Sequence, residues 1–217
     1  MVQENGKKVF KNIIYFINLG NNNMNLVFYD LETTGRNPTW DQIIQVAAIL
    51  VDSNFNEIDR FEGRCRLKPG VIPEPGALIV NNTSVEMLNQ VNLSHYELIT
   101  KIQNTFKKWS PAIFTGFNTI GFDEEFLRKT FFKSLLEPYT TQFNGNKRAD
   151  VLGMTRSSKF YYPNCLDVGM NEKGNKVFKL EVLTKMNNII HNAHDAMGDV
   201  IATIEIAKIL SLKANNI

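Results

Sequence analysis

Apolar residues between positions 26 and 67 fall into three short runs, with turn-forming residues between them. The runs cover residues 26–30, 42–52 and 57–67. Short apolar runs bounded by turn residues predict β-strands. Because the three runs follow one another with only short connections, they predict a three-strand antiparallel meander.

Helix signals dominate the chain after residue 80. Two capping boxes, in which a hydroxyl residue precedes a glutamate by three positions, are formed by Thr83 with Glu86 and by Ser94 with Glu97. The second box predicts a helix that extends to about residue 109. We expect the inward side chains of that helix to be Tyr96, Leu98, Ile102 and Phe106. Further helices are predicted at 123–136, 150–157, 181–187 and 195–212, a strand at 112–117, and irregular segments at 68–77 and 138–174.

Three meander strands followed by alternating helix and strand predict an α/β fold with a mixed β-sheet and flanking α-helices. We find no internal repeat and no linker, so we expect a single domain over residues 24–213. Residues 1–23 contain a short apolar run that is interrupted by polar residues and lacks a signal-peptide cleavage site. We therefore expect a poorly ordered N-terminal extension and a cytoplasmic, intracellular protein.

The charge balance excludes one common way of binding nucleic acid. The 217 residues include 24 Lys and Arg against 22 Asp and Glu, a formal net charge of +2, so there is no polybasic arm. Hydrophobic residues make up 43% of the chain, which excludes a disordered class. Cys65 and Cys165 lack partners at zinc-ligand spacing, and we interpret both as reduced structural thiols.

Candidate chemistry begins where the first strand ends, at Asp30 and Glu32. Residues two apart on a strand project from the same face, so these two carboxylates lie close together. Two carboxylates about 4 Å apart repel by roughly 4 kcal/mol at an effective dielectric constant of 20, and this favours a proton or a cation between them. The pair alone is equally typical of a strand end that turns into solvent. The small turn Thr33-Thr34-Gly35 that follows allows a ligand to approach the backbone.

Two further acids and a histidine occur at helix starts. Asp123 opens the helix predicted at 123–136, where an N-terminal capping role is the alternative. Asp199 lies one turn inside the last predicted helix, beside an apolar stripe. His194 precedes Asp199 by five residues, and a histidine at such a position is also typical of a surface or capping residue. His95 and His191 are interpreted as structural or surface residues.

Three ordered segments, FYDLETTG, GFNTIGFDEEFLR and NAHDAMGDV, resemble the three motifs of the DEDDh 3′-to-5′ exonucleases. That family has a ribonuclease H-like fold. Within the family the chain is most similar to the nuclease domain of bacterial exonuclease I, and the resemblance covers about residues 25–210. It implies that Asp30, Glu32, Asp123 and Asp199 hold two Mg²⁺ ions, which Mn²⁺ can replace. It also implies that His194 is the general base.

The same resemblance implies a substrate, a reaction and a set of contacts. We expect removal of nucleoside 5′-monophosphates from the 3′ end of single-stranded DNA by two-metal-ion hydrolysis. The family resemblance keeps RNA open as an alternative substrate. It also keeps a polymerase or a DNA-repair protein open as a partner. Three alternatives remain open: a proofreading exonuclease, an RNA-trimming exonuclease and a catalytically inactive nucleic-acid-binding module. The expected substrate contacts are Leu31, Thr33, Thr34, Gly35, Asn118, Phe122 and Arg148.

Overall fold

The protein is described by a computed structural model, which covers residues 24–193 and 195–213. Five strands form the main sheet in the order β3-β2-β1-β4-β5. β1 (Asn25–Thr33), β2 (Ile43–Val51) and β3 (Glu57–Arg64) pair antiparallel, which confirms the predicted meander. β4 (Ala112–Thr115) and β5 (Lys147–Arg148) extend the sheet in parallel. The sheet is therefore mixed, as the sequence predicts.

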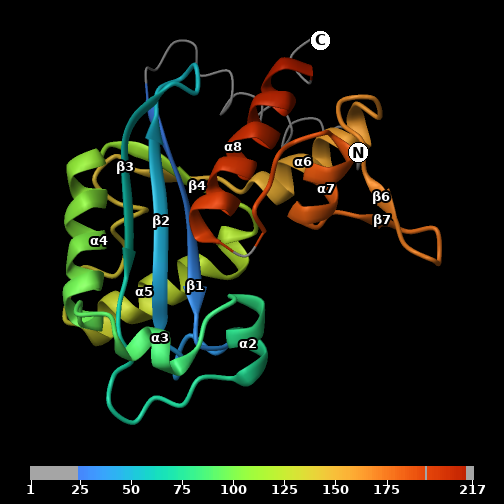
Figure 1. Cartoon of the computed structure of the whole chain (residues 1–217). Helices are drawn as coiled ribbons and strands as arrows, with labels where there is room; N and C mark the ends of the chain where they lie inside the picture. The colour runs from blue at the N-terminus through green and yellow to red at the C-terminus, as the bar shows by residue number, and fades with distance from the viewer. Residues whose placement is uncertain (1–23, 194, 214–217) are drawn as a thin grey trace.

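Side chains of β1 alternate between two hydrophobic cores, one on each face of the sheet. Figure 1 shows helices α4 and α8 on opposite sides of the sheet. Val27, Tyr29 and Leu31 pack in the core that contains side chains of α4 (His95–Trp109) and α5 (Asp123–Lys133). Phe28 packs in the other core, against α8 (Ala196–Lys213). The even-numbered residues of β1 therefore face α8, and this alternation sets the position of the site.

Helix α4 begins as the sequence predicts, but one of its expected core residues is exposed. The Ser94 side chain accepts a hydrogen bond from the backbone N–H of Glu97, and the Glu97 carboxylate accepts one from the Ser94 N–H. Leu98, Ile102 and Phe106 are buried. Tyr96 is 58% exposed, so the prediction for that residue is wrong. It lies two positions from Leu98, and residues two apart on a helix point in different directions.

The other capping box does not form where it was predicted. Helix α3 (Val85–Asn89) takes Ser84 as its N-cap, and the Ser84 hydroxyl accepts a hydrogen bond from the N–H of Met87. The observed N-cap lies one residue after the predicted one. The prediction failed because three adjacent residues, Asn82 to Ser84, all have side chains that can cap a helix.

The remaining elements are short. Helix α2 begins within the segment predicted to be irregular at 68–77, and β5 and β6 lie within the segment predicted to be irregular at 138–174. The helix predicted at 150–157 extends to Tyr161. The bounds are α2 (Pro75–Val80), the 3₁₀ helix η1 (Thr119–Gly121), α6 (Val151–Tyr161), β6 (Gly169–Met170), β7 (Lys176–Val177) and α7 (Leu180–Met186). No helix within residues 24–193 and 195–213 combines the length and apolar character needed to cross a membrane.

Candidate active site

Strand β1 presents two carboxylates to the α8 side of the sheet. Phe28 occupies the same row and is 1% exposed, so it fixes the register of the strand against α8. Asp30 and Glu32 follow at the next two positions of that row. The hydrophobic pattern of β1 thus forces both acids to the interface with α8 rather than into solvent.

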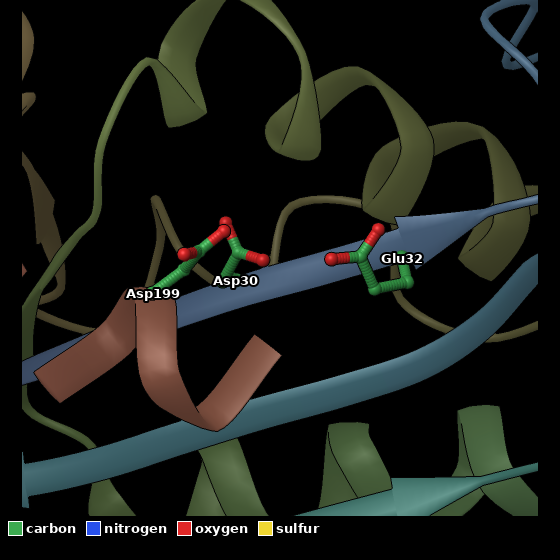
Figure 2. A group of neighbouring side chains, drawn as sticks. All are labelled: Asp30, Glu32 and Asp199. Carbon is green, nitrogen blue, oxygen red and sulfur yellow. The ribbon is translucent and has the colours of Figure 1, made fainter. Parts of the chain in front are cut away.

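The first turn of α8 brings a third carboxylate to the same place. Val200 and Ile204 of α8 pack in the core with Phe28, which holds the start of the helix over β1. Each of Asp30, Glu32 and Asp199 offers an oxygen that lies within 4.8 Å of the others. Figure 2 shows the Asp30 and Asp199 carboxylates facing each other, with Glu32 further along β1. We call these three residues the acidic group.

Burial and mutual repulsion disfavour the charged forms of the acidic group. The pKa of Asp30 is raised well above its usual range by burial and by the charges of Asp123, Glu32 and Asp199. Burial, followed by the charge of Asp199, raises the pKa of Glu32 from 4.5 to about 7. The Arg64 guanidinium opposes this rise only in part. The acidic group therefore has an excess of negative charge that a bound cation would neutralise.

Asp123 lies at the start of α5, next to the acidic group. Its side chain is 3% exposed, and its Oδ1 accepts a hydrogen bond of 3.1 Å from the backbone N–H of Leu31. Burial raises the pKa of Asp123 well above its usual range, while hydrogen bonds from its own N–H and that of Leu31 oppose the rise. Asp123 thus connects α5 to β1, and its charge raises the pKa of Asp30.

Asp195 is an acid of the site that the sequence reasoning did not assign. Its Oδ2 accepts a hydrogen bond from the N–H of Gly198, as an N-cap does, and its charge raises the pKa of both Asp30 and Glu32. Its Oδ1 lies 3.5 Å from the amide nitrogen of Gln45 on β2. The sequence did contain a signal for Asp195, because an Asp three residues before Gly198, at the start of a predicted helix, is typical of an N-cap.

His191 also belongs to the site, although its sequence context suggested only a structural or surface role. Its Nε2 lies 2.5 Å from Oδ1 of Asp199, and its Nδ1 lies 3.1 Å from the hydroxyl of Thr184 on α7. The His191 side chain is 6% exposed. Sequence spacing gives no signal for this contact, because it depends on how α7 and α8 pack against each other. His194, the expected general base, lies outside the described residues.

The turn after β1 is closed by hydrogen bonds. The Thr33 hydroxyl donates to the carbonyl of Gly35, and the Thr34 hydroxyl donates to Oδ1 of Asp41. A Cβ atom on Gly35 would lie 2.5 Å from Oδ2 of Asp41, so a larger residue there would displace the Asp41 carboxylate. Leu31, Thr33 and Thr34 have buried side chains. The turn can therefore offer a substrate mainly backbone groups.

The other three expected contact residues lie in different surroundings. Asn118 is exposed with φ +67°, and its N–H donates to Oδ1 of Asp150. Phe122 is partly buried, with its ring centroid 4.8 Å from that of Phe126. Arg148 forms an ion pair of 3.2 Å with the buried carboxylate of Glu124. Their contacts with a substrate stay predictions.

The acidic group has the chemistry of a divalent-cation site. Its donors are carboxylate oxygens, which are the ligands that Mg²⁺ and Mn²⁺ prefer. Burial and mutual repulsion raise the pKa values of Asp30 and Glu32, and a bound cation would offset that repulsion. The residues present thus fit a divalent metal ion.

Comparisons with known proteins agree with this geometry. Exodeoxyribonuclease I of Buchnera aphidicola subsp. Schizaphis graminum is 36% identical over 200 residues, which are 90% of this chain and 41% of that protein. Exodeoxyribonuclease I of Escherichia coli (strain K12) is 33% identical over 200 residues, 91% of this chain and 42% of that protein. The chain spans about two-fifths of the length of these relatives.

A solved structure is similar to the same part of this chain. E. coli Exonuclease I in complex with a dT13 oligonucleotide matches with a TM-score of 0.84 and 32% identity, over 88% of this chain and 42% of that chain. Residues 27–207 match the Exonuclease family (RNase_T), and this region contains the acidic group. The chain thus has the sheet and the acidic site within one matched region, and it belongs to the exonuclease family.

Proposed function

We propose that the chain is a metal-dependent 3′-to-5′ exonuclease that releases nucleoside 5′-monophosphates from single-stranded DNA. The observation that carries this proposal is the acidic group, in which three carboxylates from β1 and α8 offer oxygens within 4.8 Å of one another. Relatives named exodeoxyribonuclease I are 33–36% identical, whereas a Chromobacterium violaceum oligoribonuclease is 26% identical, and this favours DNA over RNA.

Four carboxylates would hold two Mg²⁺ ions in this proposal. Asp30, Glu32 and Asp199 would supply oxygens directly, and Asp123 would complete the site from α5. The bound ions would stabilise negative charge on the scissile phosphate and make a bound water more acidic. Asp123 and Glu32 are buried, Asp30 and Asp199 are partly buried, and the packing of α8 on β1 holds the elements that carry the acidic group, so the carboxylates would need little rearrangement on binding.

Two histidines take different roles. His194 would accept the proton of the attacking water, since an unperturbed imidazole pKa of about 6.5 suits a base near neutral pH. His191 would hold the Asp199 carboxylate in place through its Nε2, while Thr184 fixes the ring through Nδ1. His191 is a positioning residue in this scheme because it contacts Asp199 and no reacting atom.

Cleavage of end-labelled substrates tests the proposal. The full chain is incubated with 5′-labelled single-stranded DNA, a 3′-blocked copy, duplex DNA and RNA, each with Mg²⁺, Mn²⁺ or EDTA. We expect stepwise shortening from the 3′ end of unblocked single-stranded DNA and no cleavage in EDTA. Equal or faster cleavage of RNA would identify an RNA-trimming enzyme, and failure to cleave any substrate with metal present would refute the proposal.

A matched pair of variants connects the activity to the acidic group. Asp199→Asn removes one charge from the group, whereas Asp167→Asn makes the same chemical change at an exposed residue before β6. We expect the first variant to be inactive and the second to match the unsubstituted protein. The expectation of a polymerase or DNA-repair partner stays a prediction, which co-purification would test.

A further inference from the structure

A pocket lies on the side of the sheet opposite the acidic group. Its volume is about 470 Å³, and three segments line it: residues 66–69 after β3, residues 94–96 at the start of α4, and residues 130 and 133–135 at the end of α5. We call it the α4–α5 pocket. A volume of this size is typical of sites for small molecules. None of its lining residues belongs to the acidic group or to the expected substrate contacts.

The lining of the α4–α5 pocket is positively charged. Arg66, Lys68 and Lys133 contribute to it, and the lining contains no Asp or Glu. None of the three cations forms an ion pair with another residue in the described part of the chain. The Lys133 ammonium donates to the carbonyls of Pro38 and Thr39, at 3.2 and 3.1 Å. Glu97 and Asp41 act on Arg66 and Lys133 only from a distance, so the positive charge around the cavity exceeds the negative charge and favours an anionic occupant.

His95 provides an independent sign of a ligand. It is the first residue of α4 and lines the pocket, yet it is 7% exposed. No described residue forms a hydrogen bond with its buried Nε2. An unsatisfied buried polar atom of this kind costs about 1–3 kcal/mol, so native proteins usually provide it with a partner. Because Nε2 is itself buried, the ring would turn toward the pocket when Nε2 donates a hydrogen bond to an oxygen atom of a bound anion.

Two further features support an anion over a neutral ligand. Burial and the charges of Lys68 and Lys133 lower the pKa of His95 to about 3, so the ring is neutral at pH 7 and Nε2–H can donate. Helix α4 has 15 residues and points its N-terminus at the pocket, where its partial positive charge attracts anions.

We propose that the α4–α5 pocket binds the phosphate group of a phosphate ester, outside the acidic group. Lys68 and Lys133 would neutralise the phosphate charge, and His95 Nε2–H would donate to one of its oxygens. The phosphate could belong to a nucleoside 5′-monophosphate or to a DNA strand, because both carry the same chemical group. The proposal is independent of the exonuclease reaction, since it uses no residue of the acidic group.

Binding measured without cleavage tests the pocket. Calorimetric titration of the full chain in EDTA would use inorganic phosphate, thymidine 5′-monophosphate and an oligothymidine without terminal phosphates. The variant is the double substitution Lys68→Gln and Lys133→Gln. The control, Lys185→Gln with Lys173→Gln, removes the same charge from exposed positions outside the pocket. We expect the pocket variant to bind at least tenfold more weakly and the control to bind like the unsubstituted chain.

The outcomes separate the two sources of phosphate. If the unsubstituted chain binds thymidine 5′-monophosphate saturably and the pocket variant does not, the pocket is a nucleotide site. If the pocket variant loses binding of the oligothymidine alone, the pocket contacts a DNA strand. Equal affinities of the pocket variant and the unsubstituted chain for all three probes would overturn the proposal, as would an equal loss in the control. In ¹⁵N-histidine NMR spectra the His95 Nε2 signal should shift on binding, and an unchanged signal at saturation would also overturn it.

Discussion

Removing the charge of Glu32 should stabilise the metal-free protein at alkaline pH. Glu32 is 9% exposed on β1 and lies in the acidic group with Asp30 and Asp199. Without metal, its ionised form is disfavoured by burial and by the charges of Asp199 and Asp195. Glu32→Gln keeps the size of the side chain and removes the charge, so it isolates the electrostatic cost from packing.

The magnitude follows from the pKa of Glu32 in the folded protein, which is raised from 4.5 to about 7. A group whose pKa is raised on folding stabilises the protein below its unfolded pKa, and this contribution is lost as the pH rises through the folded pKa. At about 1.4 kcal/mol per pKa unit, the loss is about 3 kcal/mol. The difference in the free energy of unfolding between Glu32→Gln and the unsubstituted chain should therefore grow by about 3 kcal/mol, in favour of Glu32→Gln, from pH 4.5 to pH 8.

Urea denaturation in EDTA, followed by the fluorescence of the buried Trp109, measures this difference. Glu172→Gln serves as the control because Glu172 is an exposed acid in the β6–β7 hairpin. Addition of Mg²⁺ at pH 8 should stabilise the unsubstituted chain and have a much smaller effect on Glu32→Gln. The reasoning would be refuted if the two chains differed by the same amount at pH 4.5 and pH 8.

Substitutions at three other positions test the site. His194→Ala should lower the cleavage rate roughly 100-fold or more while Mn²⁺ binding, measured by calorimetry, changes little; an unchanged rate would exclude His194 as the base. His191→Ala should weaken Mn²⁺ binding about 10- to 100-fold because Asp199 loses its hydrogen-bond partner, and His191→Gln should recover part of the loss. Gly198→Ala would place a Cβ 2.3 Å from the carbonyl oxygen of Asn192. We expect it to cost about 1–3 kcal/mol in the free energy of unfolding, and an unaltered urea midpoint would contradict this.

Local patterns in the sequence were sufficient for most of the fold. Three short apolar runs and the turn signals between them predict the meander, and the Ser94–Glu97 box predicts the start of α4. These features depend on residues only a few positions apart, where backbone geometry fixes which side chains share a face. The same reasoning was wrong for Thr83 and Tyr96, where neighbouring residues compete for one cap or one buried position.

The pairing of Asp30 with Glu32 was also predictable, because two residues two apart on one strand share a face. Their meeting with Asp199 was expected only from the resemblance to known motifs, and the packing of α8 on β1 produces it. No local pattern predicted the His191 contact with Asp199, nor the meeting of Lys68, His95 and Lys133 around one pocket. The sequence determines the strands, the helices and the faces of their side chains, because those depend on neighbours along the chain. Only the tertiary structure decides which distant faces meet, because that depends on how whole helices pack on the sheet.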